Sequence, residues 1–207
     1  MESILSKLIT IFGAELPGSA AHDQMIPLNR KTKSDYKDLH FRDSSIAILL
    51  YIKDSTLHTL LIERTSYEGA HSGQISFPGG KAEELDESLE YTARRECFEE
   101  VNQNMNDAKL LGKLSDVYIP VSNFRVVPHV FWVDSLDNLT PEKREVKSII
   151  EVSSKLLLND DIVKVKDMTF GNGYKQKNVP YYDIQNHIVW GATAMIISEL
   201  KVLLNKV

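Results

Sequence analysis

The sequence has very little cysteine: Cys97 is the single one among 207 residues. An internal disulfide is therefore impossible, which argues against a small secreted domain held together by disulfides and is typical of a reducing compartment. Long hydrophobic runs are also missing, since no stretch reaches the ~18 apolar residues that a membrane-spanning helix needs. The first residues lack the basic start, apolar run and small-residue cleavage site of a signal peptide. We therefore expect a cytoplasmic protein without a membrane partner.

An excess of positive charge is absent as well. The chain carries 24 Lys and Arg against 29 Asp and Glu, a formal net charge of -5. General nucleic-acid binders need clustered Lys and Arg for phosphate contacts, so nucleic acid is not an expected partner. A small phosphate-bearing substrate is still compatible with this charge, because a bound metal ion can supply the positive charge.

The length and pattern of the chain predict one α/β domain with a mixed sheet. Residues 1–40 are expected to form an N-terminal helix (2–12) followed by an irregular arm, and residues 41–207 to form the main domain. Strands are expected at 45–53, 58–65, 109–118, 124–133, 161–170 and 179–184, with a turn at 53–56. Helices are expected at 87–101, 143–158 and 191–206.

The helix expected at 87–101 carries three glutamates on one face. Apolar or small residues recur at every fourth position and predict its buried stripe: Leu89, Ala93, Cys97 and Val101. Because a helix advances ~100° per residue, Glu96 and Glu100 lie ~40° apart, and Glu99 lies ~60° from Glu96 on the other side. Carboxylates this close repel one another unless cations neutralise them. Mg²⁺ suits them, although a solvated acidic face is the alternative.

A second feature, Phe77-Pro78-Gly79-Gly80, precedes this helix by one loop. Two glycines after a proline let the backbone turn sharply and approach a ligand or a metal ion. Taken by itself, the segment favours an ordinary turn. Taken with the acidic helix, it matches the pattern of a known family.

From Gly80 to Gln103 the sequence resembles the Nudix box: Gly, five residues, Glu, seven residues, Arg-Glu-apolar-x-Glu-Glu-x-Gly-apolar. Gly80 fits the opening glycine. The residues that fit the core of the box are Arg95, Glu96, Cys97, Glu99 and Glu100. Asn102 replaces the late glycine, and we expect it to be tolerated because Asn is the next-best residue at a left-handed helix C-cap. Gln103 replaces the last apolar residue.

The resemblance implies a Nudix-type α/β/α sandwich with a mixed central sheet. The ligands it implies for one or more Mg²⁺ or Mn²⁺ ions are Glu96, Glu99, Glu100 and Gly80. The metal would polarise a phosphoryl oxygen and activate a water. Glu145, on a later loop, is the candidate general base; a helix glutamate is the alternative base, and a solvated loop charge is the alternative interpretation of Glu145.

Arg95 would fix the loop by pairing with an acidic residue. The spacing from Gly80 to Arg95 is one residue longer than the usual box, so the acidic position falls on either Asp86 or Glu87. Glu87 is the favoured partner.

The segment 60–80, LLIERTSYEGAHSGQISFPGG, resembles the signature found upstream of the box in the coenzyme A pyrophosphatase branch of the family. The residues that fit in register are Leu60, Leu61, Arg64, Gly73, Phe77, Pro78, Gly79 and Gly80. Gly69 stands where the branch has a second Arg. The longer box and the segments 119–131 and 187–197 also look like this branch.

The implied reaction is hydrolysis of coenzyme A to 4′-phosphopantetheine and 3′,5′-ADP. Arg64, Gly79 and Gly80 would contact the substrate, with a strand-end charge in water as the alternative for Arg64. Tyr181 and Tyr182 are candidates for stacking on adenine, although strand tyrosines are more often buried. Trp190 is expected to be a core anchor.

Two other functions stay open from the sequence. Gly69 favours a Nudix hydrolase for another nucleoside diphosphate derivative, such as ADP-ribose or NADH. A Nudix-fold module that senses a nucleotide without turnover is a further alternative, but such modules usually lose the acidic cluster. A homodimer is expected only by analogy with the family.

Overall fold

Strand β1 (Arg42–Lys53) is the centre of the main sheet in the computed structural model. The structure describes residues 3–26, 41–66, 73–136, 139–169, 173 and 175–207. Within them, β1 pairs parallel with β7 and antiparallel with β2 and β4. The other strands of this sheet are β2 (Thr56–Arg64), β3 (Ile75–Ser76), β4 (Gly79–Lys81), β5 (Lys109–Lys113), β6 (Val117–Ile119), β7 (Phe124–Trp132) and β8 (Val146–Ser153).

The predicted turn between β1 and β2 is confirmed. Asp54 and Ser55 both adopt left-handed φ values, 49° and 58°. A two-residue loop with positive φ at both positions matches the right-handed twist of the flanking strands, so β1 and β2 form a tight hairpin.

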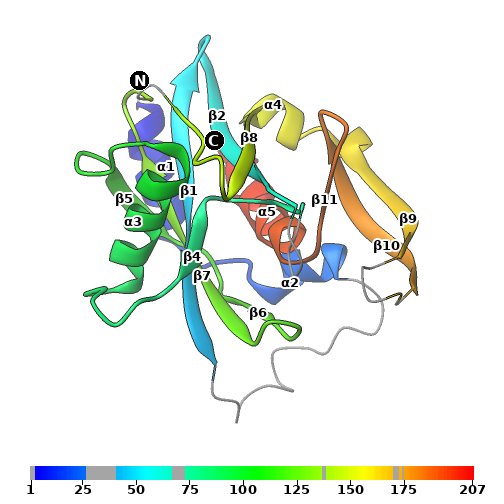
Figure 1. Ribbon diagram of the computed structural model, residues 1–207. Helices are drawn as coiled ribbons and strands as arrows, with labels where there is room; N and C mark the ends of the chain where they lie inside the picture. The colour runs from blue at the N-terminus through cyan, green and yellow to red at the C-terminus, as the bar shows by residue number, and fades with distance from the viewer. Residues whose placement is uncertain (1–2, 27–40, 67–72, 137–138, 170–172, 174) are drawn as a thin grey trace.

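The main sheet is covered on both faces, which explains why β1 reads as a continuous apolar run. Ile48 and Leu50 point into one cluster, and Ala47 and Leu49 into the other. Helix α5 (Gly191–Leu204) covers the first face and helix α3 (Leu89–Val101) the second (Figure 1). The predicted α/β/α sandwich with a mixed sheet is therefore confirmed.

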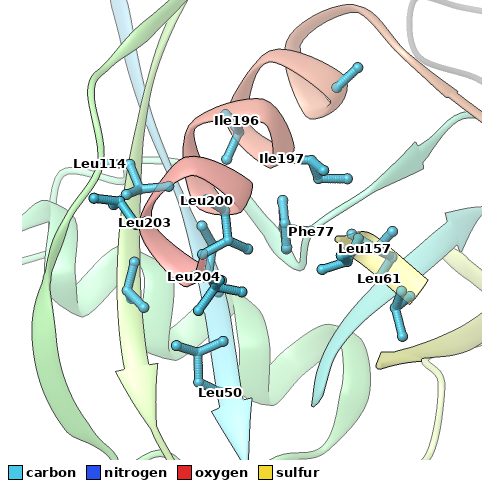
Figure 2. Packing of buried hydrophobic residues seen from close by; sticks show 14 of the residues in the cluster. Leu50, Leu61, Phe77, Leu114, Leu157, Ile196, Ile197, Leu200, Leu203 and Leu204 are labelled. Carbon is cyan, nitrogen blue, oxygen red and sulfur yellow. The ribbon is translucent and has the colours of Figure 1, made fainter. Parts of the chain in front are cut away.

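Helix α5 is buried along most of its length. Figure 2 shows the packing of its face against β1, β2 and the segment that enters β4. The labelled residues are Leu50, Leu61, Phe77, Leu114, Leu157, Ile196, Ile197, Leu200, Leu203 and Leu204. No helix in the described part of the chain is long and apolar enough to cross a membrane.

The helix predicted at 143–158 is wrong. Residues Val146–Ser153 form β8, which pairs antiparallel with β2, and only Ser154–Leu157 form a short helix, α4. A 3₁₀ turn, η3 (Asp160–Ile162), leads into a separate three-stranded sheet in the order β11-β10-β9. Its strands are β9 (Val163–Thr169), β10 (Lys175–Ile184) and β11 (His187–Trp190).

The N-terminal segment packs on the main core. Helix α1 (Ile4–Phe12) agrees with the predicted helix, and its Leu8 and Phe12 belong to the cluster under α5. The segment expected to be irregular contains two short helices, α2 (Ser19–His22) and η1 (Asp23–Met25). Residues 27–40 lie outside the described part of the chain.

A buried carboxylate, Glu199 of α5, holds this segment on the core through hydrogen bonds. It accepts hydrogen bonds from the Gly18 N–H at 3.0 Å and from the Ser115 N–H and hydroxyl at 3.0 and 2.8 Å. His22 Nε2 lies 3.1 Å from Oε2 of Glu199, the oxygen that also accepts from the Ser115 N–H. Burial opposes ionisation of Glu199, but these partners outweigh it, so the pKa of Glu199 is lowered. Such a buried carboxylate is tolerated because these hydrogen bonds satisfy both of its oxygens.

Candidate active site

Helix α3 supplies the acidic residues of the candidate site, and both of its ends are capped. Ser88 Oγ accepts from the Tyr91 N–H at 3.1 Å at the start of the helix. Asn102 ends it in the left-handed conformation, with φ 59° and its N–H donating to the Phe98 carbonyl at 2.8 Å. The expectation that Asn102 would be tolerated in place of glycine is thereby confirmed. Cys97 is fully buried on the apolar stripe, and burial raises the pKa of its thiol.

The three glutamates on α3 differ strongly in exposure. The side chain of Glu100 is 2% exposed, that of Glu96 15% and that of Glu99 54%. The exposure of the acidic face therefore decreases from Glu99, which lies in solvent, to Glu100, which is buried because it lies beside the apolar stripe.

Glu100 joins the helix to the strands before it. One of its oxygens accepts from Arg64 of β2 at 3.0 Å, and the other from the Gly79 N–H at 2.8 Å. Burial raises the pKa of Glu100 to about 7; Arg64 and Gly79 lower it, and the negative charges of Glu96 and Glu145 raise it. The substrate contact predicted for Arg64 stays a prediction, since its guanidinium here holds Glu100.

Arg95 holds the loop before the helix. It donates to both oxygens of Asp86, at 3.0 and 2.9 Å, to the Lys81 carbonyl at 3.2 Å, and to Glu96 and Glu99 at 2.9 and 3.0 Å. The paired guanidinium holds the pKa of Asp86 well below its usual range.

The partner predicted for Arg95, Glu87, is wrong. Glu87 is exposed, whereas Asp86 is nearly buried and also accepts from the Glu83 N–H at 3.0 Å and the Thr92 hydroxyl at 2.8 Å. The extra residue of the longer box therefore lies after Asp86. Thr92 is a site residue that the sequence interpretation missed, although its place one helical turn before Arg95 put it on the same side of α3.

The two glycines of β4 are there because side chains would not fit. A Cβ on Gly79, whose φ is 153°, would collide with the backbone of Ser45 and Ile46 in β1. A Cβ on Gly80 would overlap the carboxylate of Glu96. Gly80 therefore makes room for the Glu96 carboxylate against the strand, as a ligand-holding position requires.

Glu145, the candidate base, lies near the glutamates of α3. The preceding loop is fixed to the end of α3, where the Thr140 N–H donates to the Val101 carbonyl and the Glu142 N–H to the Glu100 carbonyl, both at 3.0 Å. The carbonyl of Glu145 accepts from the Thr65 N–H at 2.9 Å. Its negative charge raises the pKa of both Glu96 and Glu100.

The donor set fits a divalent ion of the magnesium type. Among the described residues no three His, Cys, Asp or Glu side chains already converge on one point, and Arg64 and Arg95 occupy oxygens of the three glutamates. Even so, burial and neighbouring negative charge raise the pKa of Glu96, as they do for Glu100. Such excess negative charge on hard oxygen atoms is what Mg²⁺ or Mn²⁺ neutralises.

The aromatic residues considered for adenine lie elsewhere. Tyr182 is buried in the core under Lys201, whose Nζ is 5.1 Å from the ring centroid, so it is no stacking platform. Tyr181 and Trp190 are half-buried neighbours across β10 and β11. Gly69 lies outside the described residues.

The chain thus combines an α/β/α sandwich with a glycine-rich strand, β4, beside an acidic helix, α3, as the resemblance of residues 80–103 to the Nudix box implies. The comparison with protein families agrees: the NUDIX domain model matches residues 42–168. The chain belongs to the NUDIX family and is a pyrophosphatase of that family, whose members generally use divalent metal ions.

Three relatives span different shares of the chain. The "Uncharacterized Nudix hydrolase NudL" of Photorhabdus laumondii is 33% identical over 165 residues, 79% of this chain and 87% of that protein. The human "Mitochondrial coenzyme A diphosphatase NUDT8" is 32% identical over 165 residues, 76% of this chain and 68% of that protein. "Nudix hydrolase 22, chloroplastic" of Arabidopsis thaliana is 28% identical over 168 residues, 77% of this chain and only 55% of that protein.

Solved structures share the fold. A MutT protein from Methanosarcina mazei Go1 has a TM-score of 0.52 at 19% identity, covering 82% of this chain and 99% of that chain. A MutT/nudix family protein from Enterococcus faecalis has a TM-score of 0.52 at 14% identity, covering 99% of this chain and 76% of that chain.

Proposed function

We propose that this Nudix hydrolase cleaves the diphosphate of coenzyme A or its derivatives, giving 4′-phosphopantetheine and 3′,5′-ADP. The observation that carries the proposal is the contact of Glu100 with Arg64 and Gly79. Arg64 and Gly79, which belong to the signature that resembles the coenzyme A branch, therefore lie beside a proposed metal-binding glutamate. The relative named as a coenzyme A diphosphatase supports the same substrate.

The chain's own groups have separate tasks in this reaction. Glu96, Glu99 and Glu100 would hold Mg²⁺ or Mn²⁺, with the Gly80 backbone beside them; the ion, when bound, supplies Lewis acidity at the phosphoryl oxygen and acidifies water. Arg95 keeps Glu96 in place, and Arg64 and the Gly79 N–H keep Glu100 in place. Glu145 would take the proton from the attacking water, because its backbone is fixed between α3 and β2 while its carboxylate is exposed.

The test is a product analysis of the purified protein with Mg²⁺ and with Mn²⁺. The substrates are coenzyme A, acetyl-CoA, ADP-ribose and NADH, and the controls are Glu100→Gln and the exposed Glu87→Gln. We expect 3′,5′-ADP to form from coenzyme A, at least 100-fold more slowly with Glu100→Gln and at an unchanged rate with Glu87→Gln.

If the enzyme prefers another compound, that compound replaces coenzyme A as the proposed substrate. Gly69 stands where the coenzyme A branch has an arginine, which favours ADP-ribose or NADH as the second candidate. Turnover of either compound with none of coenzyme A would overturn the proposal while keeping the hydrolase. No turnover of any compound would favour a nucleotide-sensing module.

A further inference from the structure

Ser76 of β3 carries a buried hydroxyl group that the proposed mechanism does not use. Its Oγ atom has no hydrogen-bond partner in the part of the chain that the structure describes. A buried polar group without a partner destabilises the folded protein, and a partner that arrives only with a ligand is one reason for keeping such a group. The other buried hydroxyl without a partner among the described residues is that of Thr59 in β2.

The side chain of Ser76 lies on the face of the main sheet that α3 covers. Ile75 and Phe77, its neighbours in the chain, both belong to the cluster under α5 (Figure 2 labels Phe77). Successive side chains of a strand point to opposite faces, so Ser76 points toward α3. Its antiparallel partner Ile62 agrees with this direction, because Ile62 packs in the cluster under α3.

Arg64 is the charged neighbour of Ser76 on this face. Ser76 pairs with Ile62, and Arg64 lies two residues beyond Ile62 in β2 with its guanidinium on Glu100 of α3. Side chains at such diagonal positions of an antiparallel pair are about 7–8 Å apart, which is within reach of a long side chain. The Ser76 hydroxyl is therefore an acceptor that the Arg64 guanidinium can reach when it leaves Glu100.

The two oxygens of Glu100 are held by different kinds of donor. One accepts from the Gly79 N–H at 2.8 Å, which is fixed in the backbone of β4. The other accepts at 3.0 Å from Arg64, whose donor is at the end of a flexible side chain. A divalent cation that binds this second oxygen repels the guanidinium. The Arg64 side chain is only 22% exposed, so a displaced guanidinium needs another acceptor nearby.

We propose that Ser76 is a positioning residue whose hydroxyl oxygen accepts the Arg64 guanidinium when a divalent cation binds Glu100. Without the cation, Arg64 holds Glu100 and the Ser76 hydroxyl has no partner. The inference rests on the proposed function only in giving Glu100 a metal-binding role, and it is independent of the substrate.

The test compares Ser76→Ala with the matched control Thr59→Val. Both variants remove a buried hydroxyl without a partner, but Thr59 faces away from α3, because its partner Val152 packs in the cluster under α5. Urea unfolding without metal measures stability, and calorimetry without substrate measures the affinity for Mn²⁺. The same Ser76→Ala change is also made in an Arg64→Met background, which has no guanidinium to be held.

We expect Ser76→Ala and Thr59→Val both to raise the urea midpoint, because each removes an unsatisfied buried group. Only Ser76→Ala should weaken Mn²⁺ binding, by roughly tenfold, since a hydrogen bond to a charged group contributes about that factor. In the Arg64→Met background, Ser76→Ala should cause no further loss of Mn²⁺ affinity.

An Mn²⁺ affinity of Ser76→Ala within about twofold of the unaltered protein would overturn the inference. An equal loss in the Arg64→Met background would also overturn it, as would a lower urea midpoint, which would mean that the hydroxyl already has a partner without metal. If Glu100→Gln leaves the Mn²⁺ affinity unchanged, the proposed metal site itself is wrong. Failure of coenzyme A as a substrate is a separate result, because neither measurement includes a substrate.

Discussion

Replacing Asp86 by Asn would release the loop that Arg95 holds. The Asp86 side chain is 3% exposed and accepts four hydrogen bonds, two of them from Arg95. Breaking a buried ion pair from one side costs about 3–5 kcal/mol. Arg95 keeps Glu96 and Glu99 as partners and Asn keeps one acceptor oxygen, so we expect the free energy of unfolding to fall by about 3 kcal/mol. Urea unfolding at neutral pH measures this loss.

The control for this prediction is Glu87→Gln. Glu87 is the neighbouring acidic residue and is exposed, so its loss should change the unfolding free energy by less than about 0.5 kcal/mol. The folded-state pKa of Asp86 is lowered from 3.8, so its stabilisation is present above that value and is lost as the pH falls through the lowered pKa. Equal losses in the two variants, or less than about 1 kcal/mol for Asp86→Asn, would refute the assignment of Asp86 as the anchor.

Three further perturbations follow from the same structure. Gly79→Ala should lower the free energy of unfolding, measured in urea, by more than about 2 kcal/mol, because its Cβ meets the β1 backbone. Gly80→Ala should mainly displace the flexible Glu96 side chain and abolish most of the activity measured by product analysis. Thr59→Val should raise the free energy of unfolding by about 1 kcal/mol, since the buried Thr59 hydroxyl has no partner in the described structure; a lower melting temperature would contradict this. The pKa of Glu100 is raised to about 7, so Mn²⁺ affinity should fall roughly tenfold per pH unit below that value. An Mn²⁺ affinity that does not change with pH, measured by calorimetry, would exclude Glu100 as a ligand.

The predictable parts of the fold were those that neighbouring residues decide. The β1 run, the turn at Asp54 and Ser55, the stripe of α3 and the cap at Asn102 each depend on a few consecutive residues. The common face of the three glutamates likewise follows from helix geometry alone.

The failures occurred where a distant partner decides the structure. Val146, Ile149 and Ile150 have the spacing of a helix face, yet their segment forms β8 because it pairs along nearly the whole of β2. Asp86 and Glu87 are indistinguishable by spacing, and only burial under Thr92 and Arg95 separates them.

The difference in exposure among the three glutamates also could not be predicted from the sequence. Glu100 is buried because β2 and β4 bring Arg64 and the Gly79 N–H to it, and neither contact follows from the helical period. Which carboxylates are ionised before metal binds therefore depends on strand pairing, not on the motif.

The fastening of the N-terminal segment by α5 has a consequence for biosynthesis. His22 and Glu199 are 177 residues apart in the chain, as are the Ser198 hydroxyl and the Ala21 carbonyl that it contacts. On the ribosome, α2 therefore cannot dock until α5 has been synthesised. Since contacts this distant in sequence form slowly, the docking of α2 on α5 should be a late step of folding, and Ala21 and His22, which are buried in the folded protein, stay uncovered until then.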